Sequence, residues 1–370
     1  MSSLQTPAEA KTYARTKLLT AILSSILSFL LLLGVVMSGF SGTLAQEVHK
    51  RAFHELAALL AFVVVLAVLN AVITLPLNFY SGYVLEHRYQ LSNQTFRQWV
   101  VEQLKGFSVG APIGLVVLFV LYSCIKAFDT MWWLPVGIVF TLLNIVAARL
   151  APILIFPLFY ESTPLQNGHL KDRLARIASE EGMRVEGVFS FNLSKNTRKA
   201  NAVFTGIGRA KRILLGDTLM HNFSNDEIET VLAHEVGHYH YRHLRKAILV
   251  GVGTTFVGLF VAAHLHSWSL DLLGIIALTD LAGLPLLAVW LSLYGLFTSP
   301  IAHLMSRRHE READAYAVRV TRNGAAFISA LRKLATMNLA DPDPHPLVEI
   351  LFYSHPPTAK RIHIVESLAG

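Results

Sequence analysis

The sequence contains a single cysteine, Cys124, and that residue lies inside an apolar run. One cysteine excludes an intrachain disulfide framework, and it excludes a zinc site built from several thiolates of one chain. Any metal that this chain binds must therefore be held by histidine and carboxylate side chains. Internal repeats and low-complexity tracts are also missing from the sequence.

Charged residues are scarce as well: they make up 15% of the 370 residues, whereas 53% are hydrophobic. This balance is too apolar for an ordinary soluble enzyme and predicts a membrane protein. The formal net charge of +7 could suggest nucleic-acid binding, but in a chain with long apolar segments basic residues are typical of cytoplasmic loops. We therefore expect the lipid bilayer as a partner, and no nucleic acid.

Six apolar stretches approach the length of about 20 residues that a bilayer core requires. They lie near 17–38, 56–79, 107–126, 131–156, 247–266 and 274–298. The first could instead be a cleaved signal peptide, with Lys17 at its start and Ala45 at a plausible cleavage distance, but its length favours an uncleaved anchor. We predict a mainly α-helical, polytopic protein with about six transmembrane helices.

An even number of spans places both termini on one side of the membrane, and basic residues indicate which side. The segments 11–17 and 88–105 and the stretches after 160 and 300 are basic, whereas the connections at 127–130 and 267–273 contain no Lys or Arg. Lys50, Arg51 and Lys126 fall on the opposite side of this scheme. We therefore expect the polar segments at the cytoplasmic face of a bacterial inner membrane or of the endoplasmic reticulum.

Two polar segments, 159–246 and 300–370, are long enough to fold outside the lipid. A transmembrane hairpin at 247–299 separates them, so both return to the same face and can build one site. Residues 1–158 form an N-terminal transmembrane region with four spans. The first polar segment should contain a small β-hairpin or sheet, with strands at 185–191 and 200–216 and a turn at Gly206 and Gly208. Helices are expected at 170–182, at about 301–320, at 324–338 and after Pro357. A Pro-rich loop from Asp341 to Pro346 precedes the last of them.

The central motif is H-E-x-x-H, formed by His234, Glu235 and His238. On a helix, residues four apart share one face, so the two imidazoles can bind one zinc ion while Glu235 reaches a metal-bound water. The alternative is an accidental match, which in a chain this rich in histidine has a probability of roughly a few per cent. Finding a third ligand would decide between the two.

The helix that carries the motif has a clear start. Ser224 and Glu227 have the spacing of a capping box, and no proline occurs between residues 224 and 284. We therefore predict one long helix that begins near residue 225 and continues into the fifth span.

Glu310 and Asp314 are the candidates for the third ligand. Catalytic zinc usually has three protein ligands and an open position for water, and two His plus one Glu is an established set. Both carboxylates lie on one face of a predicted helix. Taken alone, this Arg-rich stretch is typical of a solvated charged helix. It emerges, however, from the membrane hairpin on the same side as the H-E-x-x-H helix, which favours the ligand interpretation.

Three further motifs accompany H-E-x-x-H in the chain: Asn201-Ala202-Val203-Phe204-Thr205-Gly206, Ser306-Arg307-Arg308-x-Glu310-x-x-Ala313-Asp314-Ala315, and Ser354-His355-Pro356-Pro357 followed by Arg361. In these motifs the sequence resembles the zinc-dependent CAAX prenyl proteases of type I and the related HtpX-like membrane metalloproteases. The resemblance covers most of the chain beyond residue 80, in the family's order. The chain departs from the family in its span count, because eukaryotic CAAX proteases have seven spans.

Residue by residue, the resemblance makes His234, His238 and Glu310 the ligands of one Zn2+ per chain, and it makes Glu235 the general base. Asp314 would hold one ligand imidazole in its correct tautomer. The resemblance also implies a hollow, water-filled chamber between the spans.

Substrate contacts follow from the same resemblance. Asn201 would bind the peptide backbone through its amide, and Ala202 and Arg361 complete the expected substrate-binding set. His355 would donate a hydrogen bond to the oxyanion; a structural His-Pro-Pro turn that starts the last helix is an equal alternative.

Several other ionisable residues have simpler interpretations. Four histidines near the motif are expected to be interfacial or packing residues: His240, His243, His264 and His266. Asp280 and Arg149 lie at membrane depth, where ionisable groups are often functional, although each could also snorkel from a span end.

The resulting hypothesis is a membrane-embedded zinc metalloendopeptidase that hydrolyses peptide bonds with zinc-activated water and, like a CAAX protease, acts on membrane-associated or lipidated peptides. One alternative is an HtpX-like quality-control protease that cuts misfolded membrane proteins. Another is a non-catalytic zinc-binding membrane scaffold or transporter. Glu235 argues against the scaffold, because a structural site has no use for a base between its ligands.

Overall fold

The computed structural model describes residues 7–165, 168–180, 185–205, 211–275 and 277–369. Within these ranges six helices are long and apolar enough to cross a membrane: Ala8–Met37, Glu55–Arg88, Phe96–Met131, Trp133–Phe159, His243–Leu273 and Leu281–Thr321. Each of the six predicted stretches overlaps one of them, so the polytopic helical architecture is confirmed.

Residues 7–159 form the N-terminal helical region. Its helices are α1 (Pro7–Met37), α2 (Phe40–Arg51), α3 (Glu55–Phe79), α4 (Leu85–Arg88), α5 (Phe96–Phe128), α6 (Trp133–Leu150) and α7 (Phe156–Phe159). A capping box fixes the start of α5, where the Thr95 side chain accepts a hydrogen bond from the backbone of Gln98. The first helix begins well before residue 17, because the polar segment that precedes the apolar run is helical too.

The remaining elements alternate between the polar segments and the membrane hairpin. They are β1 (Ser162–Pro164), α8 (Gly168–Glu180), β2 (Val185–Phe191), β3 (Ala202–Thr205), β4 (Lys211–Gly216), α9 (Asp217–Asn222), α10 (Asn225–His240), α11 (His243–Leu273), α12 (Leu284–Thr321), α13 (Gly324–Met337), α14 (Pro346–Phe352) and α15 (Thr358–Ala369). The sixth span and the predicted helix at 301–320 are one continuous helix, α12. The helix α14 was not predicted.

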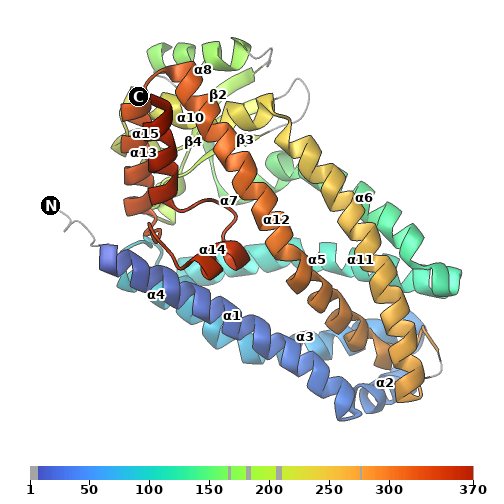
Figure 1. The fold of residues 1–370 in the computed structure, drawn as a ribbon. Coiled ribbons are helices and arrows are strands. Elements are labelled where there is room, and N and C mark those ends of the chain that lie inside the picture. Colours follow the sequence, from blue (N-terminus) through green and yellow to red (C-terminus); the bar gives the residue numbers. More distant parts are fainter. Residues whose placement is uncertain (1–6, 166–167, 181–184, 206–210, 276, 370) are drawn as a thin grey trace.

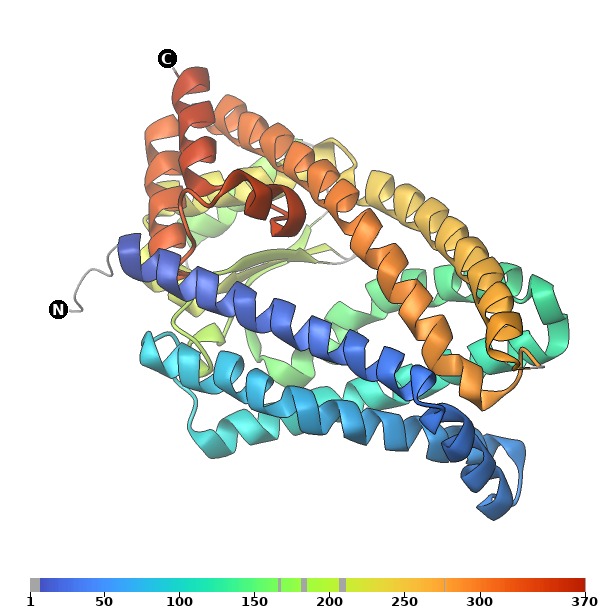
Figure 2. The same cartoon turned by 60° about the horizontal axis from the view of Figure 1, so that its bottom comes forward.

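The membrane helices are spread out instead of forming a solid bundle (Figures 1 and 2). α1 contacts α3 and α12, while α11 contacts α6 and α12. The buried share of the apolar window in each span ranges from 0% in Trp133–Phe159 to 39% in Leu281–Thr321. Most residues in these windows are therefore not buried within the protein.

The sheet has four strands in the order β1-β2-β4-β3. β1 and β2 are antiparallel, β2 and β4 are parallel, and β3 runs antiparallel to β4 at the edge. Strand β2 occupies the predicted residues 185–191, and the predicted strand at 200–216 comprises β3 and β4. Gly206 and Gly208, the predicted turn, lie outside the described residues.

One hydrophobic core joins the two polar segments. It includes Leu174 of α8, Ile213 of β4, Leu232 of α10, Ala317 of α12 and Phe327 of α13, all buried. Residues before and after the membrane hairpin thus share a single core. Figure 1 shows the helices α8, α10 and α13 grouped together at one end of the molecule.

The prediction of one uninterrupted helix from residue 225 into the fifth span is wrong. Helix α10 ends at His240 and α11 begins at His243, with Arg242 in the left-handed region at φ 55°. A straight helix would place residues five apart on different faces. The break instead turns His243 back toward His238, to which it is hydrogen-bonded.

Candidate metal centre

Helix α10 carries the H-E-x-x-H motif and is anchored at its start. Ser224 and Glu227 form the predicted capping box, and Glu227 also accepts hydrogen bonds from Ser329 and Lys333 of α13. Burial favours the neutral acid, but these hydrogen bonds lower the pKa of Glu227. The helix start is therefore fixed to α13 by a charged contact, which limits how the motif can shift.

Close packing of α10 against α12 brings the third carboxylate to the motif. Gly237, one of the two unspecified positions of H-E-x-x-H, lies against α12: a Cβ atom there would be 3.0 Å from Cα of Ala313 and 3.1 Å from Cβ of Tyr316. A side chain at this position would push the helices apart. The glycine thus allows Glu310 to lie beside both imidazoles.

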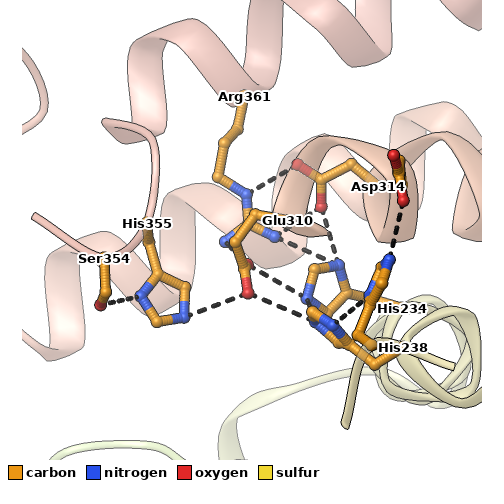
Figure 3. A network of polar contacts seen from close by, with 9 residues as sticks. His234, His238, Glu310, Asp314, Ser354, His355 and Arg361 are labelled. Atoms are coloured by element: carbon orange, nitrogen blue, oxygen red, sulfur yellow. Dashed lines mark hydrogen bonds and ion pairs between the residues drawn. The ribbon is translucent and has the colours of Figure 1, made fainter. Parts of the chain in front are cut away.

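His234, His238 and Glu310 form a triad suited to one metal ion, with ligand atoms that all lie within 4.8 Å of one another. Nε2 of His234 is 3.2 Å from Nε2 of His238 and 3.3 Å from Oε2 of Glu310, and Oε1 of Glu310 is 3.3 Å from Nε2 of His238 (Figure 3). The structure therefore brings together the three predicted ligands.

Two observations support a cation at this point. Oε2 of Glu310 is buried and lacks a hydrogen-bond partner among the described residues. Burial opposes protonation of His234, yet its hydrogen bond to Asp314 and the Glu310 carboxylate 3.3 Å from its Nε2 raise its pKa to about 9. The surroundings thus favour positive charge, and nitrogen and carboxylate ligands of this kind fit zinc.

Asp314 lies behind His234 and not in the triad. Its Oδ1 accepts a hydrogen bond from Nδ1 of His234 at 2.8 Å, which leaves Nε2 free to bind a metal. The same carboxylate is held by Arg361, with Nη2 2.6 Å from Oδ1 and Nε 2.8 Å from Oδ2. Arg361, predicted to bind substrate, thus directs its guanidinium mainly to Asp314 (Figure 3).

His238 has an equivalent support that the sequence analysis missed. Its Nδ1 lies 2.9 Å from Nδ1 of His243, whose Nε2 lies 2.8 Å from Oε2 of Glu312. The ring of His309 stacks on His243 at 4.0 Å between centroids. His243 therefore contacts a candidate ligand instead of only packing, and the histidine five residues after His238 was the available signal.

The triad opens into a cleft of about 500 Å³ lined by most of the predicted substrate and catalytic residues: Asn201, Ala202, Glu235, His355 and Arg361. Nε2 of His355 lies 3.4 Å from Oε1 of Glu310, and its Nδ1 is 2.9 Å from Oγ of Ser354. The edge strand β3 contributes Ala202 to the wall of this cleft.

The remaining ionisable candidates lie away from this cleft. Asp280 caps a short 3-10 helix through the backbone of Ala282, and His266 bonds to the carbonyl of Gly283. His264 bonds to its own helix, and Arg149 lies in the last turn of α6. The ring of His240 packs at a tilt against that of Tyr316, with the ring centroids 5.0 Å apart. These contacts fit the packing roles expected for the histidines other than His243.

Two family models together match almost the whole chain. The family "Peptidase family M48" matches residues 164–369, and "CAAX prenyl protease N-terminal, five membrane helices" matches residues 2–161. The structure has four helices long and apolar enough to span a membrane within the described part of the latter range.

Curated relatives cover most of the chain. The uncharacterized metalloprotease YhfN of Bacillus subtilis is 29% identical over 99% of this chain and 87% of its own. CAAX prenyl protease 1 of Saccharomyces cerevisiae is 29% identical over 82% and 71%, and the human CAAX prenyl protease 1 homolog is 26% identical over 85% and 75%. The crystal structure of S. mikatae Ste24p matches with a TM-score of 0.86 at 26% identity, covering 97% of this chain and 88% of that one.

Proposed function

We propose, for a chain that belongs to peptidase family M48 and is a membrane metalloprotease of the CAAX prenyl protease family, the activity of a zinc endopeptidase. His234, His238 and Glu310 hold the metal in this proposal. The observation that carries the proposal is the convergence of these three ligand groups within 4.8 Å. Membership in a peptidase family removes the alternative of a non-catalytic scaffold.

The chemistry follows from the groups around the triad. When bound, zinc supplies the Lewis acidity that lowers the pKa of a water molecule toward neutrality. Glu235, on the cleft side of α10, accepts the proton as the water attacks the scissile carbonyl, and later returns it to the leaving amine. His355 donates from Nε2 to the oxygen that becomes negative, a role that its hydrogen bond with Ser354 supports by occupying Nδ1.

Asp314 and Arg361 act behind the metal. Burial of Asp314 favours its neutral form, but the contacts with His234 and Arg361 lower its pKa, so it stays ionised and accepts the hydrogen bond from Nδ1 of His234. Both residues therefore orient a ligand; neither needs to touch the substrate.

We propose extended, membrane-associated or lipidated peptides as substrates. The edge strand β3 borders the cleft, so a peptide can add to it as a further strand, with Asn201 and Ala202 at the contact. The curated relatives named CAAX prenyl protease support a prenylated chain as one such substrate.

The direct test uses purified, zinc-loaded protein, a farnesylated C-terminal peptide and its unlipidated twin, with the products identified by mass spectrometry. Preferential cleavage of the farnesylated peptide supports the CAAX-type function. Equal cleavage of both favours a broader, HtpX-like role in quality control. Failure to cleave either peptide would contradict the proposed endopeptidase.

The active site is proposed to face the cytoplasm, on the basis of the basic segments around the polar regions. Single cysteines placed near residues 165 and 340, in a Cys124-free background, should both react with an impermeant reagent applied from the cytoplasmic side. Labelling of the two positions from opposite sides would overturn the topology.

A further inference from the structure

A second cavity of about 690 Å³ continues from the metal cleft. The two cavities share Asn201, Asn338 and Asp341, and the second then extends to Lys199 and to Lys17 of α1. The catalytic mechanism described above makes no use of this region. It lies at one end of the path that a peptide would follow along β3.

Two lysines and one glutamate mark the end of this cavity. The ammonium group of Lys199 is 2.8 Å from Oε2 of Glu86, and Lys17 also forms an ion pair with Glu86. The hydroxyl of Tyr13 donates to Glu86 at 2.6 Å. The two ammonium groups share one carboxylate, so this cluster carries a net charge of +1 when all three groups are ionised.

The cluster presents its positive side to the cavity. The side chain of Glu86 is 11% exposed, whereas that of Lys17 is 45% exposed, and both lysines line the cavity. Burial and the charge of Lys17 lower the pKa of Lys199 in spite of its hydrogen bond to Glu86. A second anion beside these lysines would therefore be favourable.

The backbone next to the cluster limits how far a peptide can pair with β3. The Asn201 carbonyl accepts from Gly216 of β4, so the backbone groups of Ala200 and Ala202 point to the outer edge. At Ala200 those groups are already used: its N–H donates to Oδ1 of Asn338 at 3.1 Å, and its carbonyl accepts from Nδ2 at 3.3 Å. Strand addition can include Ala202 but ends before Ala200.

We propose that the cavity lined by Lys17 and Lys199 binds the free C-terminal carboxylate of the peptide substrate. The peptide then runs antiparallel to β3, the pairing on the edge strand ends at Asn338, and its last residues enter the cavity. This inference rests on the proposed endopeptidase function and adds which side chains hold the end of the substrate, Lys17 and Lys199. A charge-assisted contact of this kind is among the stronger hydrogen bonds in proteins.

Asp341 provides a matched test of opposite sign. It is a carboxylate in the wall of the same cavity, where its Oδ1 accepts from the backbone of Asp343 at 3.1 Å. Its charge opposes binding of a carboxylate. Asp341→Asn keeps an acceptor for that backbone bond while it removes the charge, so it should strengthen a preference for acidic ends.

The experiment compares three peptides of one sequence that end in a free acid, an amide or a methyl ester. With zinc-loaded wild-type protein, we expect kcat/KM to be about tenfold higher for the acid than for either neutral form, mainly through KM. Lys17→Gln and Lys199→Gln should bring the ratio toward one, with zinc content unchanged, and Asp341→Asn should increase it.

Lys195→Gln is the control, because Lys195 bonds to the Phe159 carbonyl and lies near Glu102, outside this cavity. It should keep the wild-type ratio. Lys199→Gln could destabilise the protein by leaving Glu86 with one fewer partner. In that case the Lys17→Gln variant, in which a half-exposed side chain is changed, and the wild-type ratio of kcat/KM for acid and amide still test the inference. Equal turnover of acid and amide by the wild type overturns this inference and leaves the endopeptidase intact. Failure to cleave any of the three peptides counts against the endopeptidase itself.

Discussion

The metal centre and the membrane helices achieve order in different ways. Around the triad, polar groups hold one another at 2.6–2.8 Å, as in the contacts from Arg361 through Asp314 to His234. In the spans, at most 39% of the apolar window is buried. Short-range polar contacts therefore determine the geometry of the site, while the spans determine where the site is held. Substitutions in the two regions should differ sharply in effect.

The largest effect is expected for Glu235→Gln, which keeps the metal ligands but removes the base. Turnover should fall by about 10²–10⁴-fold, the contribution typical of general acid–base catalysis. Metal analysis should still find about one zinc per chain, since the triad is intact. Glu229→Gln is a matched control on the same helix, where Glu229 pairs with Arg173. Full activity in the Glu235 variant would contradict its role.

His355→Ala should reduce turnover per zinc-loaded molecule by about 10²–10³-fold, because it removes one donor to the developing oxyanion. Its zinc content should not change. A structural His-Pro turn predicts instead a lower yield of folded protein with turnover within a few-fold of the parent, and that result would remove His355 from the catalytic set.

His243→Phe tests the polar network without removing a ligand. The phenyl ring can keep the stacking on His309 but loses the contact with Nδ1 of His238. Zinc affinity, measured by chelator competition, should weaken by about 10–100-fold. His264→Phe is the control in the span, because within the described residues His264 bonds to the Phe260 carbonyl of its own helix and lies away from the metal cleft. Equal zinc affinity in both variants would make the His243 contact irrelevant.

The smallest effects separate the two regions through a pair of glycines. Gly237→Ala forces a Cβ atom to 3.0 Å from the backbone of Ala313 and should cost about 1–3 kcal/mol of stability, with weaker zinc binding. Gly251→Ala in α11 meets nothing within 4 Å and should leave melting temperature and zinc content almost unchanged. Similar melting curves for both variants would show that α10 and α12 are not tightly packed.

The sequence was most informative where chemistry requires a fixed spacing. His234 and His238, and likewise Glu310 and Asp314, are four residues apart on helices, so their grouping follows from helical periodicity. The six spans follow from apolar length in the same way. These patterns are local: each can be recognised in a short stretch of sequence without knowing the contacts that the stretch makes with the rest of the chain.

Features that depend on distant contacts could not be predicted. The break between α10 and α11 contains no proline and accompanies the contact of His243 with His238. The parallel pairing of β2 with β4 depends on strand order, and the cluster of Lys17, Glu86 and Lys199 joins three distant parts of the chain. No sequence window contains both partners of such contacts.

The helix α12 joins the bilayer to the reaction. It continues for 38 residues, about 57 Å at the rise of an α-helix, with its apolar half in the membrane and Glu310 and Asp314 near its other end. A span that is too long for the surrounding lipid tilts. Because α12 is long, a small tilt of its membrane half displaces Glu310 at the other end, unless the helix bends at Pro300, the one proline in its interior. A change in membrane thickness would thus be transmitted along α12 to the segment that carries Glu310 and Asp314.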